Sequence, residues 1–263
     1  MRDFTYHRPT SVADAVKAFS GKSEPRYLAG GHSLLPTMKQ RLNAPSDLID
    51  LGGIKELKGI KVSASEVVIG GGTTHAEVAH SAEIKKAIPA LCVLADGIGD
   101  PQVRNRGTIG GSLANADPAS DYPAAVLGLG ATIVTNKREI AGDGFFKDLF
   151  ETALEDGEII TAVKFPVPEK AGYAKFAQPA SRFCIVGVMA AKTKGGVRVG
   201  ITGAGPSAFR AAALEKALSG NFSADTALPA VQSDGLNSDI HASAEYRAHL
   251  IGVMTKRAVA AAG

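Results

Sequence analysis

Two glycine-containing segments constrain the fold of this chain more than any other feature. The first, Ala29–Pro36, reads AGGHSLLP, and the second, Thr108–Asp121, reads TIGGSLANADPASD. Each carries adjacent glycines followed by a hydroxyl residue, and glycine allows the phosphates of a ligand to lie directly against backbone N–H groups. We therefore expect a fold that brings these two distant segments together around the diphosphate of one dinucleotide.

Length and composition indicate an ordinary folded protein. The 263 residues suffice for one large domain or two linked ones, and 45% of them are hydrophobic while 21% are charged. The formal net charge is +3, and the lysines and arginines are dispersed. Because no basic run has aromatic residues interleaved, the sequence disfavours nucleic-acid binding.

Neither a membrane segment nor a metal centre is expected on this chain. No apolar stretch approaches the length of a membrane span, and Met1–Arg8 does not resemble a signal peptide, so we expect a cytoplasmic protein. The two cysteines, Cys92 and Cys184, lie in apolar runs. Two thiols alone cannot ligate an iron–sulfur cluster or a structural zinc ion, so we predict buried packing roles for both.

Periodicity and capping residues predict an α+β chain. Ser11 with Asp14, and Thr74 with Glu77, are typical helix starts. Helices are expected at 12–19, 37–42, 74–82, 88–95, 122–129, 209–218 and 244–262. Strands are expected at 27–29, 47–51, 60–62, 66–69, 131–135, 158–165, 173–176, 184–191 and 197–202. The proline-bounded run 166–172 is the candidate domain boundary.

A third glycine segment, Gly203–Ala208, follows a predicted strand and resembles a Rossmann dinucleotide-binding motif. Its context is wrong, however. Too little chain follows for a doubly wound sheet, no acidic residue ends a second strand at the required distance, and Pro206 removes a backbone N–H. A strand-to-helix turn that needs glycine for close packing is the preferred interpretation. Gly70–Gly72 could also be a phosphate loop, but a capped helix after a strand already explains these glycines.

The polar residues of the second segment have two interpretations each. Asn115 and Asp117 suit a ligand site, but they also suit an ordinary turn. Asp121 could accept a hydrogen bond from a ribose or ribityl hydroxyl, or it could cap the helix that begins at Tyr122. No lysine follows either segment in P-loop spacing, so a Walker-type nucleotide site is unsupported.

Taken together and in this order, the two segments resemble the FAD-binding medium subunit of the molybdenum hydroxylases, the xanthine dehydrogenase and carbon monoxide dehydrogenase family. The resemblance extends to Phe4–Pro9, Arg104–Gly107 and Gly203–Pro206, and so covers nearly the whole chain. The chain departs from some relatives at Ser181–Cys184, where they carry an acidic residue and a tyrosine beside the flavin. Phe183 is the aromatic residue available there.

The resemblance implies an FAD-binding fold of the vanillyl-alcohol oxidase type, followed by a C-terminal domain with a small antiparallel sheet and helices. The FAD-binding domain would cover residues 1–168, with a first lobe of about 1–53 and a second of about 54–168. The C-terminal domain would cover 169–263.

The resemblance also implies which residues bind the cofactor. Asp121 would make a polar contact to FAD, Ile160 and Lys175 would lie near the isoalloxazine ring, and Ile98 would lie near the adenine end. The residues expected to hold the pyrophosphate are Ala29, Gly30, Gly31, His32, Ser33, Leu34, Leu35, Thr108, Ile109, Gly110, Gly111 and Ser112.

The implied function is electron transfer through FAD inside a larger oxidoreductase. A large subunit would carry the molybdenum cofactor, and a small subunit would carry two [2Fe–2S] clusters, in a heterotrimer or a dimer of heterotrimers. This chain would need no acid–base residue and no metal. The alternatives are an NAD(P)-dependent dehydrogenase that uses Gly203–Ala208, and a non-catalytic dinucleotide-binding module.

Overall fold

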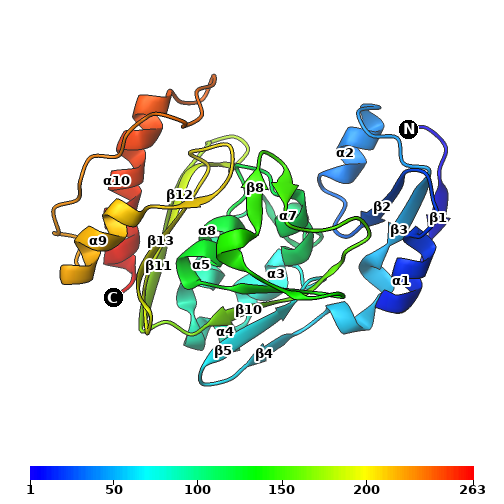
Figure 1. Cartoon of the computed structure of the whole chain (residues 1–263), viewed down its shortest axis with the longest axis horizontal. Helices are drawn as coiled ribbons and strands as arrows, with labels where there is room; N and C mark the ends of the chain where they lie inside the picture. The colour runs from blue at the N-terminus through cyan, green and yellow to red at the C-terminus, as the bar shows by residue number, and fades with distance from the viewer.

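The computed structural model describes all 263 residues, and they form three regions that follow one another along the molecule (Figure 1). The N-terminal region lies at one end, in blue. A central region in cyan and green holds the largest sheet, and the C-terminal region in yellow to red lies at the other end. This α+β arrangement confirms the fold class predicted from the sequence.

The N-terminal region is a small parallel sheet with two helices. Its strands have the order β1–β3–β2, with both outer strands parallel to β3. Ser11 accepts a hydrogen bond from the Asp14 amide and so starts α1 as predicted. The elements are β1 (Thr5–His7), α1 (Val12–Phe19), β2 (Pro25–Leu28), α2 (Leu34–Lys39), β3 (Asp47–Asp50) and the 3₁₀ turns η1 (Leu51–Gly53) and η2 (Lys55–Leu57).

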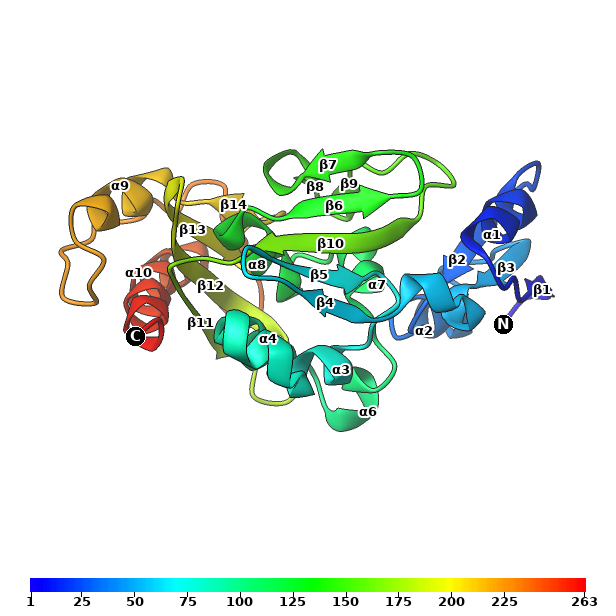
Figure 2. The ribbon, with the colours of Figure 1, turned by 90° about the horizontal axis from the view of Figure 1, so that it is seen from below.

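The central region is built on an antiparallel sheet with the strand order β4–β5–β10–β6–β7. Figure 2 shows these strands side by side in this order. Its strands are β4 (Ile60–Val62), β5 (Glu66–Gly70), β6 (Thr132–Thr135), β7 (Glu139–Ala141) and β10 (Ile160–Pro166). A separate hairpin, β8 (Phe146–Asp148) with β9 (Glu151–Thr152), follows the turn η3 (Gly142–Gly144).

The helices of this region differ from the prediction at two places. The predicted helix 74–82 has its capping box but is divided into α3 (His75–His80) and α4 (Ala82–Ala87), because Ser81 is extended and caps the second helix. The second glycine segment, for which the sequence predicted no helix, contains helix α7 (Ile109–Asn115). The other helices are α5 (Pro89–Asp96), α6 (Pro101–Arg104) and the wholly buried α8 (Tyr122–Leu129).

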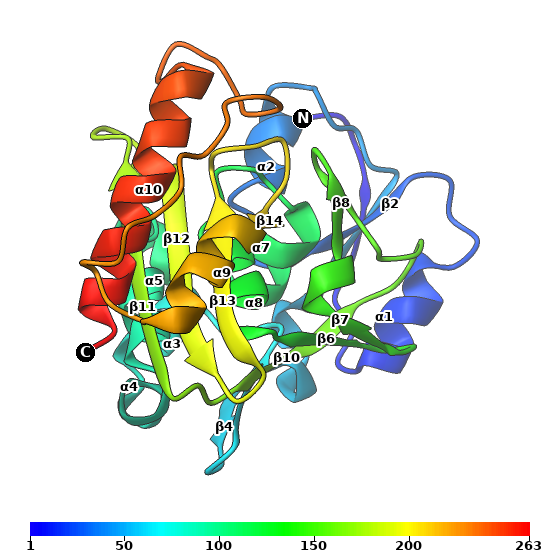
Figure 3. The same ribbon diagram turned by 60° about the vertical axis from the view of Figure 1, so that its left-hand side comes forward.

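The C-terminal region is an antiparallel sheet of order β11–β12–β13–β14 between two layers of helix. Helices α9 and α10 cover its outer face (Figure 3), and α8 packs against β12 and β13 from the inner side. The elements are β11 (Lys170–Ala177), β12 (Cys184–Thr193), β13 (Gly196–Thr202), β14 (Phe209–Arg210), α9 (Ala212–Gly220) and α10 (Ala244–Ala261). None of the helices combines the length and apolarity that crossing a bilayer requires.

This antiparallel sheet rules out a Rossmann fold at Gly203–Ala208. The segment leads into strand β14, where the sequence predicted the start of a helix. A Cβ atom at Gly203 would lie 2.6 Å from the carbonyl oxygens of Cys184 and Ile185, so glycine serves close packing there, as preferred from the sequence. Cys92 and Cys184 are both buried and unpaired, which confirms their packing role.

Candidate cofactor site

The structure brings the two glycine segments into direct contact. A Cβ atom at Gly30 would lie 2.6 Å from the Cα atom of Gly107 and still closer to the carbonyl oxygen of Arg106. One at Gly111 would lie 3.3 Å from the Cβ atom of Ala29. Since Cβ atoms do not tolerate the first of these distances, the absence of a side chain at Gly30 is what allows the segments to meet.

The first segment offers unused backbone donors. No N–H group from Gly30 to Leu34 donates a hydrogen bond within the protein. Gly31 has a φ of +78°, and His32 and Ser33 are exposed. Consecutive free amides in such a turn form an anion-binding concavity, so this segment fits a phosphate group.

The second segment differs, because its main-chain amides are not free to donate to a phosphate, contrary to the prediction from the sequence. The amides of Ile109 and Gly110 donate to the carbonyl oxygens of Thr73 and Gly71, at 3.1 and 2.9 Å. The Gly111 amide donates to Thr108 Oγ1 at 3.1 Å, and the Ser112 amide donates to the Thr108 carbonyl. Their donors are already used, because these residues begin helix α7.

Turn chemistry explains part of the polarity after α7. Asp117 Oδ1 accepts a hydrogen bond from the Ala119 amide at 2.9 Å, which is an ordinary Asx turn. The hydroxyls of Ser112 and Ser120 lie 2.6 Å apart. Asn115 makes no side-chain hydrogen bond within the protein, so it remains free for a ligand.

Asp121 forms a buried ion pair with another predicted site residue. Its Oδ1 atom accepts from Lys175 Nζ at 2.8 Å and from the Tyr173 hydroxyl at 2.6 Å, and its side chain is 5% exposed. It does not cap α8 with its side chain. Burial raises the pKa of the Asp121 carboxyl, while Lys175 and Tyr173 oppose that rise. Because both contacts use Oδ1, Oδ2 can still accept from a ligand hydroxyl.

Lys175 links this ion pair to two further segments. Its ammonium also donates to the carbonyl oxygens of Gly97 at 2.8 Å and Arg182 at 2.9 Å. Ile98, the residue expected near the adenine end, therefore follows directly on a Lys175 contact. Its own carbonyl accepts from Arg104 at 3.1 Å, which fixes the turn.

Ile160 lies at the start of β10, beside Gly71. Gly71 in turn packs against Gly110, where an added Cβ atom would lie 2.6 Å from the Gly71 carbonyl oxygen. The run Gly70–Gly72 is thus a turn between strand β5 and the capped helix α3, and it packs beneath the second segment. Phe183, by contrast, is 56% exposed.

A buried histidine lies beneath the second segment. His75 is 5% exposed, its amide donates to the Gly107 carbonyl at 2.9 Å, and its Nδ1 atom has no partner. The ring of Tyr122 lies 5.4 Å away, and its hydroxyl is also without a partner. Burial lowers the pKa of His75 to about 4, helped by His32 and Arg104, so the imidazole is neutral at pH 7.

Sequence reasoning missed two contributors to this site. Tyr173 holds Asp121, and the period-2 alternation of strand β11 could have indicated it, because Tyr173 and Lys175 share one face. Gly30 packs against the carbonyl oxygen of Arg106. No sequence pattern indicated this contact, apart from the position of Arg106 just before the second segment. No cluster of three or more His, Cys, Asp or Glu side chains is placed to share a metal ion.

Comparison with known proteins decides the family. Residues 2–168 match the FAD binding domain in molybdopterin dehydrogenase, and residues 173–262 match the CO dehydrogenase flavoprotein C-terminal domain. The chain belongs to this flavoprotein family. It therefore contains an FAD-binding domain followed by a C-terminal flavoprotein domain, and its relatives are subunits of oxidoreductases.

The similarity spans the whole chain. The carbon monoxide dehydrogenase medium chain of Hydrogenophaga pseudoflava is 34% identical, covering 98% of this chain and 96% of the relative. The glyceraldehyde dehydrogenase medium chain of Sulfolobus acidocaldarius is 34% identical, covering 97% of each chain. A structure of carbon monoxide dehydrogenase from Hydrogenophaga pseudoflava has a TM-score of 0.88 and 36% identity, covering 99% of this chain and 97% of that one.

Proposed function

We propose that the chain is the electron-transferring FAD subunit of a multi-subunit molybdenum-containing hydroxylase. When bound, FAD supplies the means to take up electrons from [2Fe–2S] clusters on a small subunit and to release them to an external acceptor. The molybdenum cofactor and the substrate pocket belong to a large subunit. The relatives support this division, because similar chains serve enzymes named for carbon monoxide and for glyceraldehyde.

One observation carries the proposal, namely that the two distant glycine segments meet, with Gly111 against Ala29 and with Gly30 against Gly107, the residue just before the second segment. On one side of this contact the free amides of Gly30–Leu34 donate to a phosphate. On the other, the hydroxyls of Thr108 and Ser112 line a rigid wall. Asp121 then accepts from a cofactor hydroxyl, and no residue is required to transfer a proton.

Reconstitution tests the proposal directly. The purified full chain incubated with FAD and desalted should retain flavin absorbance. Adding the partner subunits and a reductant should then reduce the bound flavin and bleach its absorbance. A chain that retains no FAD, or flavin that stays oxidised in the complete complex, would contradict the binding and the electron-transfer parts of the proposal, respectively.

A further inference from the structure

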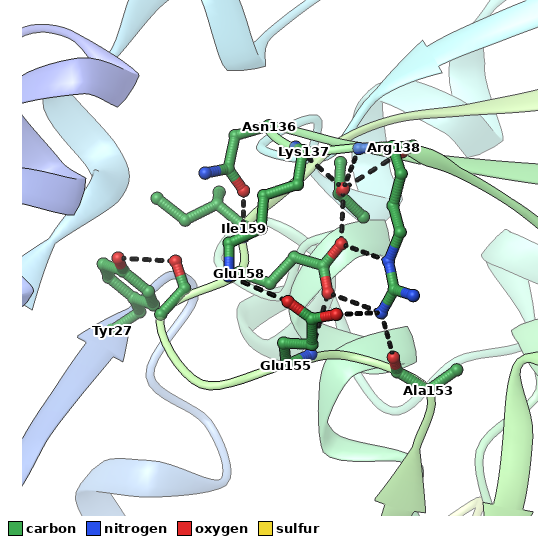
Figure 4. Close-up of polar contacts among 10 residues, drawn as sticks. Tyr27, Asn136, Lys137, Arg138, Ala153, Glu155, Glu158 and Ile159 are labelled. Atoms are coloured by element: carbon green, nitrogen blue, oxygen red, sulfur yellow. Dashed lines mark hydrogen bonds and ion pairs between the residues drawn. The ribbon is translucent and has the colours of Figure 1, made fainter.

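The segment Gly157–Ile159 joins the N-terminal and central regions. Ile159 is buried in the N-terminal hydrophobic cluster together with Phe19 and Ile54. The Tyr27 hydroxyl donates to the Gly157 carbonyl oxygen at 3.1 Å (Figure 4). The segment also touches the Phe19 ring, which a Cβ atom at Gly157 would approach to 3.2 Å. A stretch of the central region is therefore built into the core of the N-terminal one.

Tyr27 makes the single hydrogen bond that joins residues 1–53 to the chain beyond Leu57. Its ring stacks on Phe19 with centroids 4.6 Å apart, and burial raises the pKa of its hydroxyl to about 12, so it stays a neutral donor. Tyr27 lies on β2, two residues before Ala29. The position of the first glycine segment therefore depends on this hydrogen bond, on apolar packing and on the close approach of Gly30 to Arg106 and Gly107.

Glu158 points the other way, into the central region. Its carboxylate is fully buried and accepts from Arg138 Nε at 3.1 Å, Thr135 Oγ1 at 2.6 Å and the Glu155 amide at 2.7 Å (Figure 4). Burial alone would raise the pKa of Glu158, but these three partners lower it to about 2. The ionised carboxylate thus fastens the segment to the β6–β7 turn while Ile159 and Gly157 face the N-terminal region.

The same segment also leads to the second glycine segment. Glu158 is two residues before Ile160, whose carbonyl oxygen packs against Gly71. The Gly71 carbonyl in turn accepts the Gly110 amide at 2.9 Å. Glu158 therefore lies on a continuous path of contacts that runs from the first glycine segment, through Tyr27, to the second.

We propose that Glu158 is a positioning residue for the dinucleotide site. Its ion pair with Arg138 fixes Gly157–Ile159 and, through Tyr27, sets the separation of the two glycine segments. This inference rests on the proposed function, because it assumes that both segments hold one diphosphate. A ligand that spans both segments should respond to loss of Glu158, whereas a ligand with one phosphate should not.

The test compares FAD, ADP and AMP by calorimetric titration of the full chain, at a temperature where every variant is folded. Glu158→Gln removes the charge and keeps the shape, and Tyr27→Phe removes one hydroxyl and keeps the ring stacking. In each variant we expect FAD and ADP to bind about tenfold more weakly, and AMP to change by less than about twofold. The double variant should lose little more, because both changes act through one segment.

Glu139→Gln is the matched control, since it breaks an exposed ion pair with Lys164 on the same sheet and should leave the ratio of ADP to AMP affinity unchanged. An unchanged ratio in both test variants of a chain that binds FAD would overturn the inference alone. Equal losses for ADP and AMP would overturn it too, because they indicate general loosening. A wild-type chain that binds no FAD would overturn the proposed function and this inference with it.

Discussion

The two glycine segments look alike in sequence, yet the protein uses them in opposite ways. Gly30–Leu34 keeps its amides free, and neither His32 nor Ser33 is buried. Ile109–Ser112 uses its amides to begin helix α7 and to pack on Gly71. Paired glycines therefore form a turn with free amides in one case and a close-packed helix start in the other. We call Gly30–Leu34 the receptive turn, and Ile109–Ser112 with its cap Thr108 the wall.

This difference separates binding from stability. A change at the exposed residues His32 and Ser33 of the receptive turn should weaken ligand binding with little effect on the free energy of unfolding, because few internal contacts depend on them. A change to a capping or packing group of the wall should lower the free energy of unfolding, because its donors already pair with protein acceptors, whereas a charge added on the ligand side of the wall should weaken binding. The following variants test this division, from the largest expected effect to the smallest.

Gly111→Asp should weaken FAD binding by about a thousandfold, because it places a carboxylate against the diphosphate where the segments meet. An acidic residue in the first turn of α7 is favourable for the helix, so the loss cannot come from the helix itself. Titration with FAD measures the effect. Gly111→Ala is the control, and near-normal binding by the Asp variant would refute the placement of the phosphates.

Lowering the pH should destabilise the wall through His75. Its pKa of about 4 in the folded chain lies below its value of 6.5 in the unfolded chain, so the unfolded state binds the proton first. The contribution of neutral His75 to the free energy of unfolding is fully present above pH 6.5. It falls by about 3 kcal/mol as the pH drops from 6.5 to 4. Urea titrations should show that His75→Phe removes this slope and that His80→Gln, at an exposed site, does not.

Gly30→Ala should weaken FAD binding by about thirtyfold, because the added methyl group meets the backbone of Arg106 and Gly107 and separates the segments. Backbone atoms cannot rotate away as a side chain can. Flavin fluorescence quenching measures the affinity. Gly144→Ala, in an exposed turn with open space around it and no positive φ, is the control; an equal loss there would point to general strain.

Thr108→Ala should lower the free energy of unfolding by about 1 kcal/mol, since it removes the cap of α7. Ser33→Ala should leave it unchanged, because Ser33 caps α2 with no side-chain hydrogen bond. Chemical denaturation of both variants measures the contrast. If the two variants lose equal stability, the division between wall and receptive turn is wrong.

Local patterns in the sequence predicted most of the fold. Alternation and capping located the hairpin of β4 and β5, and the run 122–129 matched α8, because burial and helix caps are encoded within a few residues. The sequence predicted no helix at the wall, because adjacent glycines disfavour a helix even though Thr108 is a typical helix cap. That helix is stabilised by Gly71 and Thr73, which a local pattern cannot identify.

The candidate site was predictable in its parts but not in its connections. The contact between the glycine segments followed from the sequence, whereas the pairing of Asp121 with Lys175 required the fold. The Tyr27 contact with Gly157 joins residues that no periodicity relates. Such pairings depend on how regions assemble, and that information is spread over many residues.

Lys175 gives the C-terminal region a direct influence on the candidate cofactor site. One ammonium group holds a carboxylate, the Gly97 turn and the Arg182 carbonyl at once. Any shift of strand β11 must therefore release the Asp121 carboxylate and free the Gly97 turn of the central region. The last third of the polypeptide thus supplies the positive charge that neutralises Asp121, and replacing Lys175 with a neutral residue would leave a buried anion without its partner.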